Sequence, residues 1–185
     1  MGLGNPGPDY RDTRHNAGFW FLDQWAASRG LVFKKAWFQP YVWCSLVQGG
    51  HQIFFVKPMT YMNLSGTVLP VLLQKFRASP DDLLVVFDQM DLPPGRVRLK
   101  PKGSHAGHNG LRSVETALGS SDYYRLAIGI GRPARDILDY VLGTPDAGER
   151  AAIDAAVARS VSQSDAAWTL GWEPLLNAVN QPVSA

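Results

Sequence analysis

Hydrophobic and polar positions follow two periods along this chain, which predicts alternating strands and helices. Short apolar runs bounded by Gly, Pro or Asn indicate strands, and the run at 83–87 contains no polar residue. Apolar residues that recur every three to four positions indicate helices, and Gly30 and Gly119 supply stop signals after two of them. We predict strands at 43–48, 52–56, 83–88, 96–100 and 125–131, and helices at 16–29, 64–77, 109–118, 135–142 and 147–169.

This order of elements favours an α/β fold. An uninterrupted apolar run such as 83–87 is expected in a central strand that is covered on both faces. The length of 185 residues suits one domain with a sizeable core, and the sequence contains no repeat, low-complexity segment or linker. We therefore predict a single domain over residues 1–185, a three-layer sandwich in which helices flank a mixed, largely parallel sheet.

Composition narrows the class of protein only slightly. The chain is 45% hydrophobic and 18% charged, as is ordinary for a globular protein. It has no apolar run that could span a bilayer and no signal-peptide pattern, so we expect a cytoplasmic protein with no membrane partner. The net charge of +2 is modest for a protein that binds nucleic acid. We expect the single cysteine, Cys44, to be a buried apolar residue rather than a nucleophile.

The amino-terminal segment contains the first candidate chemistry. Residues 4–7 (GNPG) form a predicted turn that presents the amide of Asn5, and residues 13–18 (TRHNAG) place His15 at a predicted helix start. Residues 2–7 also match the glycine pattern of dinucleotide-binding loops. That motif needs a preceding strand and a helix that opens directly from the glycines, and neither is evident here. We therefore favour an active-site edge over a nicotinamide site.

Three further polar residues occupy similar settings. Asp88 ends the apolar run at 83–87, and ligand sites of open α/β sheets lie beyond such strand ends. Asn63 and Asn109 lie in turn-rich segments just before helical patterns. A histidine oriented by a carboxylate can activate water, and amides can position that water and hydrogen-bond an acyl oxygen. The Gly-x-Ser-x-Gly pattern is absent, so water is a better candidate for the attacking group than a serine.

Each of these residues also has an ordinary structural interpretation. Asn63 and Asn109 could simply cap the helices that follow them. The spacing of His105 and His108 is compatible with metal binding, but the sequence offers no third ligand at a recognisable spacing, and we predict no metal site. The glycine-rich segment 100–110 is a candidate mobile lid or clamp, and its alternative is an ordinary surface loop.

Taken together, the motifs resemble a known family. Residues 4–7, 13–18, 62–66, 88–95, 107–111 and 125–131 are similar in order and spacing to the bacterial peptidyl-tRNA hydrolases, and the resemblance weakens only after about residue 143. It implies a monomeric α/β sandwich that cleaves the ester between a peptide and the 3′-terminal ribose of tRNA. It also implies that no metal or cofactor is needed. The product would be tRNA recycled from peptidyl-tRNA that has left the ribosome.

The resemblance also implies roles for individual residues. His15 would be the general base, Asp88 its orienting carboxylate, and Asn109 the group that fixes water and stabilises the oxyanion. Contacts to the peptide and to the CCA end and acceptor stem of tRNA would come from Asn5, Tyr10, Tyr61, Met62, Asn63, Lys100, His108 and Asn109, with Lys100 and His108 along the RNA approach. The alternative is a non-catalytic RNA-binding module of the same fold.

Three features depart from the family pattern. Family members have several apolar residues before the first motif, so we expect a short opening strand or a truncated start. Ala127 replaces an arginine that would contact a tRNA phosphate, which leaves Lys100, with Arg125 or Arg132, for that contact. Pro70 falls inside a predicted helix and should either kink it or delay its start.

Overall fold

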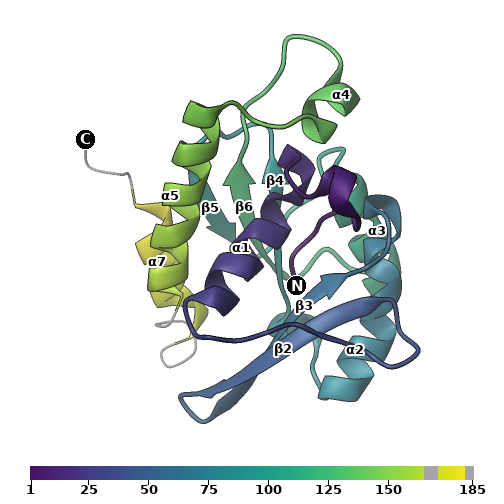
Figure 1. Ribbon diagram of the computed structural model, residues 1–185. Coiled ribbons are helices and arrows are strands. Elements are labelled where there is room, and N and C mark those ends of the chain that lie inside the picture. Colours follow the sequence, from purple (N-terminus) through teal and green to yellow (C-terminus); the bar gives the residue numbers. More distant parts are fainter. Residues whose placement is uncertain (165–170, 182–185) are drawn as a thin grey trace.

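The computed structural model describes residues 1–164 and 171–181. Its strands form two three-stranded sheets, which lie side by side (Figure 1). The first is antiparallel, in the order β1 (Lys34–Lys35), β2 (Tyr41–Gln48), β3 (His51–Pro58). The second has the order β4 (Leu84–Gln89), β6 (Tyr124–Gly129), β5 (Val97–Lys100), in which β6 is parallel to β4 and antiparallel to β5.

The amino-terminal residues join the two sheets. The Gly2 amide donates to the Val56 carbonyl of β3 at 3.0 Å, while Leu3 donates to the Val86 carbonyl of β4 at 2.8 Å. The Val86 amide in turn donates to the Met1 carbonyl at 2.9 Å. Residues 1–3, the opening strand of this sequence, therefore connect β3 to β4 through backbone hydrogen bonds.

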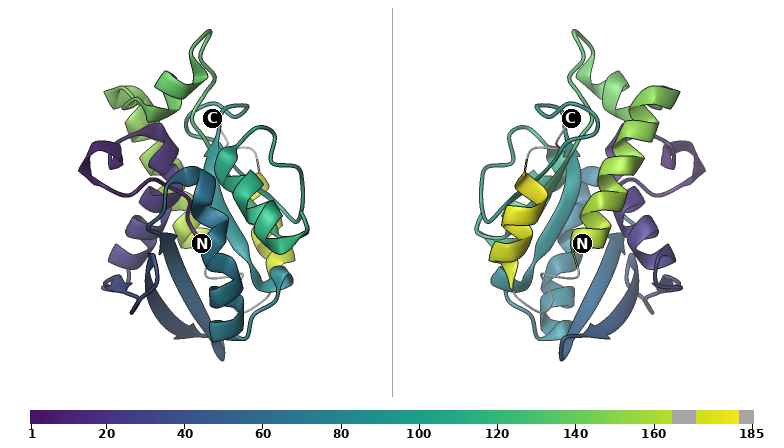
Figure 2. Two further views of the ribbon diagram at one scale, coloured as in Figure 1. Left: turned by 90° about the vertical axis from the view of Figure 1, so that its right-hand side faces the viewer. Right: turned by 90° about the vertical axis from the view of Figure 1, so that its left-hand side faces the viewer.

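Helices cover both faces of this layer (Figures 1 and 2). One apolar cluster packs α1 (Ala17–Ala27), α5 (Ala147–Gln163) and α7 (Trp172–Asn180) against the sheet. The other cluster includes residues of the 3₁₀ helix η3 (Met62–Val68), α2 (Leu69–Phe76) and α3 (Asn109–Leu118). The remaining short elements are η1 (Pro8–Tyr10), η2 (Arg14–Asn16), η4 (Pro80–Asp82) and α4 (Ile137–Leu142). None of the helices in the described ranges is long and apolar enough to cross a membrane.

The α/β fold class is confirmed, and the five predicted strands occur within a few residues of their expected bounds. Fewer strand pairs are parallel than we expected, because the Gly49–Gly50 turn makes β2 and β3 a hairpin and β5 runs against β6. The sequence did not predict β1 or α7. Helix α5 ends at Gln163, and positions 165–169 of its predicted range lie outside the described residues. Cys44 is buried, as expected.

The predicted helix at 64–77 is two elements, and Pro70 explains the boundary between them. The segment begins as η3, and α2 starts only at Leu69, which places Pro70 in the first turn. In the first turn a proline costs no internal hydrogen bond, and its fixed φ is already helical. Pro70 therefore delays the start of the α-helix and does not kink it.

This position leads to a stability prediction. We expect Pro70→Ala to lower the free energy of unfolding by about 0.5 kcal/mol, because proline restricts the unfolded chain and is not strained here. Thermal unfolding checks this, and hydrolytic activity should be unchanged. A clear rise in Tm would mean that the ring strains the helix after all.

Candidate active site

Two histidines from distant parts of the chain meet at the carboxylate of Asp88. His15 lies in η2, Asp88 is near the end of β4, and His108 directly precedes α3. The His15 Nδ1 atom is 2.9 Å from both carboxylate oxygens of Asp88, and the His108 Nε2 atom is 2.9 Å from Oδ1. The imidazole rings are tilted by 49° with centroids 5.0 Å apart. The sequence-predicted pair of His15 and Asp88 is thus brought together, with His108 as a third member.

The hydrogen bonds determine which nitrogens carry protons. The His108 Nδ1 atom accepts from the amides of Gly110 and Leu111, so its Nε2 atom must be the one that donates to Asp88. An ionised Asp88 can only accept, so the Nδ1 atom of His15 must also donate. This tautomer leaves the Nε2 lone pair of His15 available to take a proton.

Electrostatics reinforce this assignment. Burial by itself raises the pKa of Asp88, but the nearby charges of His15 and His108 and their hydrogen bonds outweigh it and hold the pKa well below its ordinary value. Burial by itself lowers the pKa of His15, but the charge of Asp88 and its hydrogen bond raise the pKa above the ordinary value of 6.5. Asp88 therefore stays ionised, and His15 binds a proton more tightly than a free imidazole does.

Asn5 lies in the loop between the opening strand and η1. Its Oδ1 atom accepts from the Met62 amide at 2.7 Å, which fixes the side chain and leaves its Nδ2 group to donate. The side chain of Asn16 holds the Asn5 backbone through two hydrogen bonds, of 2.7 Å and 3.0 Å. Asn5 is therefore a rigidly placed amide donor, as a substrate-binding role requires.

Neither of the other two asparagines caps a helix. His108 is the N-cap of α3, and Asn109 is the first residue of that helix. Asn63 is the second residue of η3, whose N-cap is Tyr61. Both asparagine side chains are exposed. The capping interpretation is therefore wrong for Asn63 and Asn109, and both amides are accessible to a substrate.

The remaining predicted contact residues lie on several elements. Met62 is buried at the start of η3, and its sulfur lies so close to Gly110 that a side chain at that position would collide with it. Tyr10 and Tyr61 form an edge-on pair with ring centroids 6.3 Å apart. Lys100 is exposed at the end of β5. We expected His108 along the RNA approach, but its ring is instead buried against Asp88.

The expectation for Arg125 is wrong, because this residue is buried, with 3% of its surface exposed. It donates to the carbonyls of Ser104 and Ser121 and to the carboxylate of Glu115. A tRNA phosphate therefore cannot reach it. Ala127 is also buried, 8% exposed, whereas Lys100 and Arg132 are exposed. Arg132 pairs with Asp91 at 2.6 Å.

Two buried residues that support the site were not predicted. Asn16 orients Asn5, as described above. Arg14, 8% exposed, donates to the Glu149 carboxylate at 2.6 Å and to the Tyr140 carbonyl at 3.2 Å, which anchors η2 to α4 and α5. The polar run at 13–16, directly ahead of an apolar helix, is a sequence signal that could have indicated both positions. The two partners of Arg14 lie more than 100 positions away along the chain, so only the folded chain reveals its role.

The cluster of His15, Asp88 and His108 also has the composition of a metal site. One ligand atom from each residue lies within 4.8 Å of the others. In this structure the Asp88 carboxylate accepts hydrogen bonds from His15 Nδ1 and His108 Nε2. His105, the other histidine considered from its spacing, instead accepts from the Gly107 amide at 3.1 Å.

Comparisons with known proteins agree with one another. The sequence model of the family described as peptidyl-tRNA hydrolase matches residues 1–185. Peptidyl-tRNA hydrolases of Neisseria gonorrhoeae and Delftia acidovorans are each 44% identical over 165 residues, which is 87% of this chain and 85% and 79% of theirs. The crystal structure of peptidyl-tRNA hydrolase from Acinetobacter baumannii has a TM-score of 0.90 at 36% identity, over 97% of this chain and 92% of that one. The crystal structure of a complex of peptidyl-tRNA hydrolase with N-propanol has a TM-score of 0.92 at 35% identity, over 100% of this chain and 94% of that one.

Proposed function

The chain belongs to the peptidyl-tRNA hydrolase family, and we propose that His15, Asp88 and Asn109 carry out its hydrolysis of the ester between a peptide and the 3′-terminal ribose of tRNA. The observation that carries this proposal is the His15 ring, whose Nδ1–H is held by Asp88 so that Nε2 can accept a proton. A non-catalytic RNA-binding module would not need a buried, ionised carboxylate to fix that tautomer.

The reaction follows from these groups. His15 Nε2 removes a proton from a water molecule as it attacks the ester carbonyl, and Asp88 stabilises the imidazolium that forms. The exposed amide of Asn109 positions the water and donates to the developing oxyanion. The imidazolium then returns its proton to the ribose oxygen as the ester bond breaks. An alkoxide leaving group needs less assistance than an amine, so this small set of groups can be sufficient.

The substrate would be held by the groups around this centre. Asn5 and Asn63, with Met62, Tyr10 and Tyr61 beside them, would bind the peptide and the ribose of the CCA end. Lys100 would contact a phosphate of the acceptor stem, because it is exposed and its charge suits that partner. His108 would act through Asp88 as a positioning residue. The glycine-rich segment 100–110, which leads from the end of β5 into the start of α3, would act as a lid or clamp over the substrate.

We further propose that the protein acts in the cytoplasm as a monomer.

The test of the activity is the release of peptide from an N-blocked aminoacyl-tRNA, measured with and without a chelator. We expect multiple turnovers at the same rate in both conditions. Binding of tRNA without turnover would identify an RNA-binding module, and loss of turnover with the chelator would identify a metal-dependent hydrolase.

The exposed asparagines give a prediction that separates catalysis from structure. We expect Asn109→Ala to lower kcat by about 10²–10³-fold, the usual cost of losing a donor to an oxyanion. Tm should be unchanged, because Asn109 does not cap α3. Asn63→Ala should likewise leave Tm unchanged and weaken turnover. Asn177→Ala is the matched control, since Asn177 is an exposed asparagine on α7. Normal kinetics in both variants would remove the two amides from the mechanism.

A further inference from the structure

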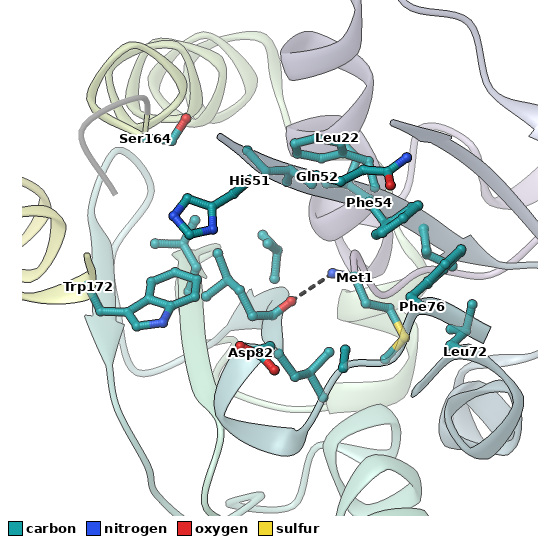
Figure 3. A pocket seen from close by; sticks show the side chains of 18 of the residues that line it. Met1, Leu22, His51, Gln52, Phe54, Leu72, Phe76, Asp82, Ser164 and Trp172 are labelled. Carbon is teal, nitrogen blue, oxygen red and sulfur yellow. Dashed lines mark hydrogen bonds between the residues drawn. The ribbon is translucent and has the colours of Figure 1, made fainter. Parts of the chain in front are cut away.

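Two aromatic side chains project into solvent from the turn between β1 and β2. Trp37 is 87% exposed and Phe38 is 95% exposed, and their rings form an edge-on pair with centroids 6.0 Å apart. In contrast, Figure 3 shows Phe54 of β3 beside Phe76 of α2, whose stacked rings lie 3.8 Å apart and pack against the core. Trp37 and Phe38 bury almost no surface in the folded chain, so the fold does not explain them.

The backbone holds Phe38 in an unfavourable conformation. Its φ is 55°, in the left-handed region that a bulky side chain rarely adopts and that Gly or Asn adopts at lower cost. Hydrogen bonds fix the turn nevertheless. The Ala36 amide donates to the Tyr41 carbonyl at 3.1 Å, and the Met59 amide donates to the Pro40 carbonyl at 2.7 Å. An exposed phenylalanine at such a position points to contact with another molecule.

The turn lies next to the segment that would bind the substrate. The pairing of β2 with β3 and the hydrogen bond from Met59 bring residues 36–40 beside residues 59–64, which include Asn63. Five of the ten large apolar side chains that are exposed in the described residues belong to these two segments. We call these five the apolar strip: Trp37, Phe38, Met59, Tyr61 and Leu64.

The strip lies a few strands away from the catalytic cluster. From β4, which carries Asp88, the strands follow in the order residues 1–3, β3 and β2. Three steps of about 4.8 Å between strands put β2 about 14 Å from β4. An extended peptide advances about 3.3 Å per residue, so the fourth and fifth residues from an ester at His15 would reach the turn.

The distribution of charge favours a peptide over RNA at this strip. Residues 36–50 and 58–74 contain no Asp, Glu, Lys or Arg, whereas RNA binding depends on cations that neutralise phosphates. Lys100 is exposed at the end of β5, which lies on the other side of β4 from β2. Lys34 and Lys35 are exposed on β1, which is an edge strand among the described residues, and lysines there prevent pairing with other chains. The RNA would therefore lie toward Lys100 and the peptide toward the strip.

We propose that the turn of Trp37 and Phe38 is a subsite for apolar side chains four to five residues before the ester in the peptide of peptidyl-tRNA. This subsite rests on the hydrolase activity proposed above and adds a preference to it. Peptides that are at least four residues long and apolar at their amino-terminal part bind best. Because a contact this far from the ester is the same in the ground state and the transition state, it lowers KM and leaves kcat unchanged.

The test compares KM for three substrates, N-acetyl-Gly-tRNA, N-acetyl-Phe-Leu-Gly-Gly-Gly-tRNA and N-acetyl-Ser-Asn-Gly-Gly-Gly-tRNA. We expect KM to be about tenfold lower for the Phe-Leu substrate than for the Ser-Asn substrate, because only apolar side chains gain from burial against the aromatic rings. The double variant Trp37→Ser with Phe38→Asn should remove this difference and leave KM for N-acetyl-Gly-tRNA unchanged. Its Tm should not fall, because both side chains are exposed and asparagine tolerates the left-handed φ.

Val32→Ser with Val47→Ser is the matched control, because both valines are exposed and lie outside the strip. It should retain the tenfold difference. Equal KM values for the two pentapeptide substrates, with normal hydrolysis of N-acetyl-Gly-tRNA, would overturn the subsite alone. Failure to hydrolyse any substrate would overturn the proposed activity and the subsite with it.

Two further measurements exclude other occupants. The double variant Trp37→Ser with Phe38→Asn should bind uncharged tRNA as tightly as the unaltered protein does, and sedimentation should give both proteins the same mass. Weaker tRNA binding by the variant would make the aromatic pair an RNA contact. Dimers that only the unaltered protein forms would make the pair a contact between two copies of the chain. Either result would overturn the proposal.

Discussion

His15→Ala is expected to lower kcat by about 10²–10⁴-fold, the usual contribution of a general base. The His15 ring is the one imidazole of the cluster with a nitrogen left free for water, because both nitrogens of His108 are hydrogen-bonded. Affinity for tRNA should be retained, because the variant loses the group that activates water and keeps Lys100 and the asparagines. Peptide release under single-turnover conditions, with tRNA binding measured separately, checks both parts.

His51→Ala is the matched control for this variant, because His51 is an exposed histidine at the start of β3. It should hydrolyse peptidyl-tRNA at the normal rate. Near-normal turnover by His15→Ala would remove His15 from the mechanism, whatever its effect on Tm. A loss of tRNA binding equal to the loss of rate would instead make His15 a binding residue.

Asp88→Asn is expected to lower kcat by up to about 10⁴-fold with little change in KM. An asparagine side chain can turn its amide toward His15 and donate to Nδ1, which favours the tautomer with the proton on Nε2. That tautomer cannot accept a proton from water. An effect confined to KM would place Asp88 in substrate binding.

The same variant makes a prediction about pH. In the unaltered protein the raised pKa of His15 means that kcat/KM falls as pH drops through a value above 6.5, where the base becomes protonated. Asp88→Asn removes the charge that raises this pKa and leaves the burial that lowers it. We therefore expect the acidic limb of the profile to move to lower pH in the residual activity. An unmoved limb would mean that another group limits the rate, and an NMR titration of the His15 ring would identify its pKa directly.

How far the sequence predicted the site depended on what each residue contacts. His15 and Asp88 were each recognisable locally, as a histidine at a helix start and an aspartate at a strand end, and the family resemblance implied that they are partners. The resemblance assigned His108 to the RNA approach, and its hydrogen bond to Asp88 is evident only in the folded chain. Arg125 was a candidate phosphate contact, and only the folded chain shows that Ser104, Ser121 and Glu115 already bind it.

The sequence by itself determined the α/β order of elements, the bounds of the long strands and the motifs that carry the chemistry. These follow from hydrophobic periodicity, glycine stops and proline, which act over a few residues. The tertiary structure alone decided the strand directions and the joining of two sheets by residues 1–3. It also decided that His108 caps α3. Those features come from packing between segments far apart in the chain, and packing of that kind has no period in the sequence.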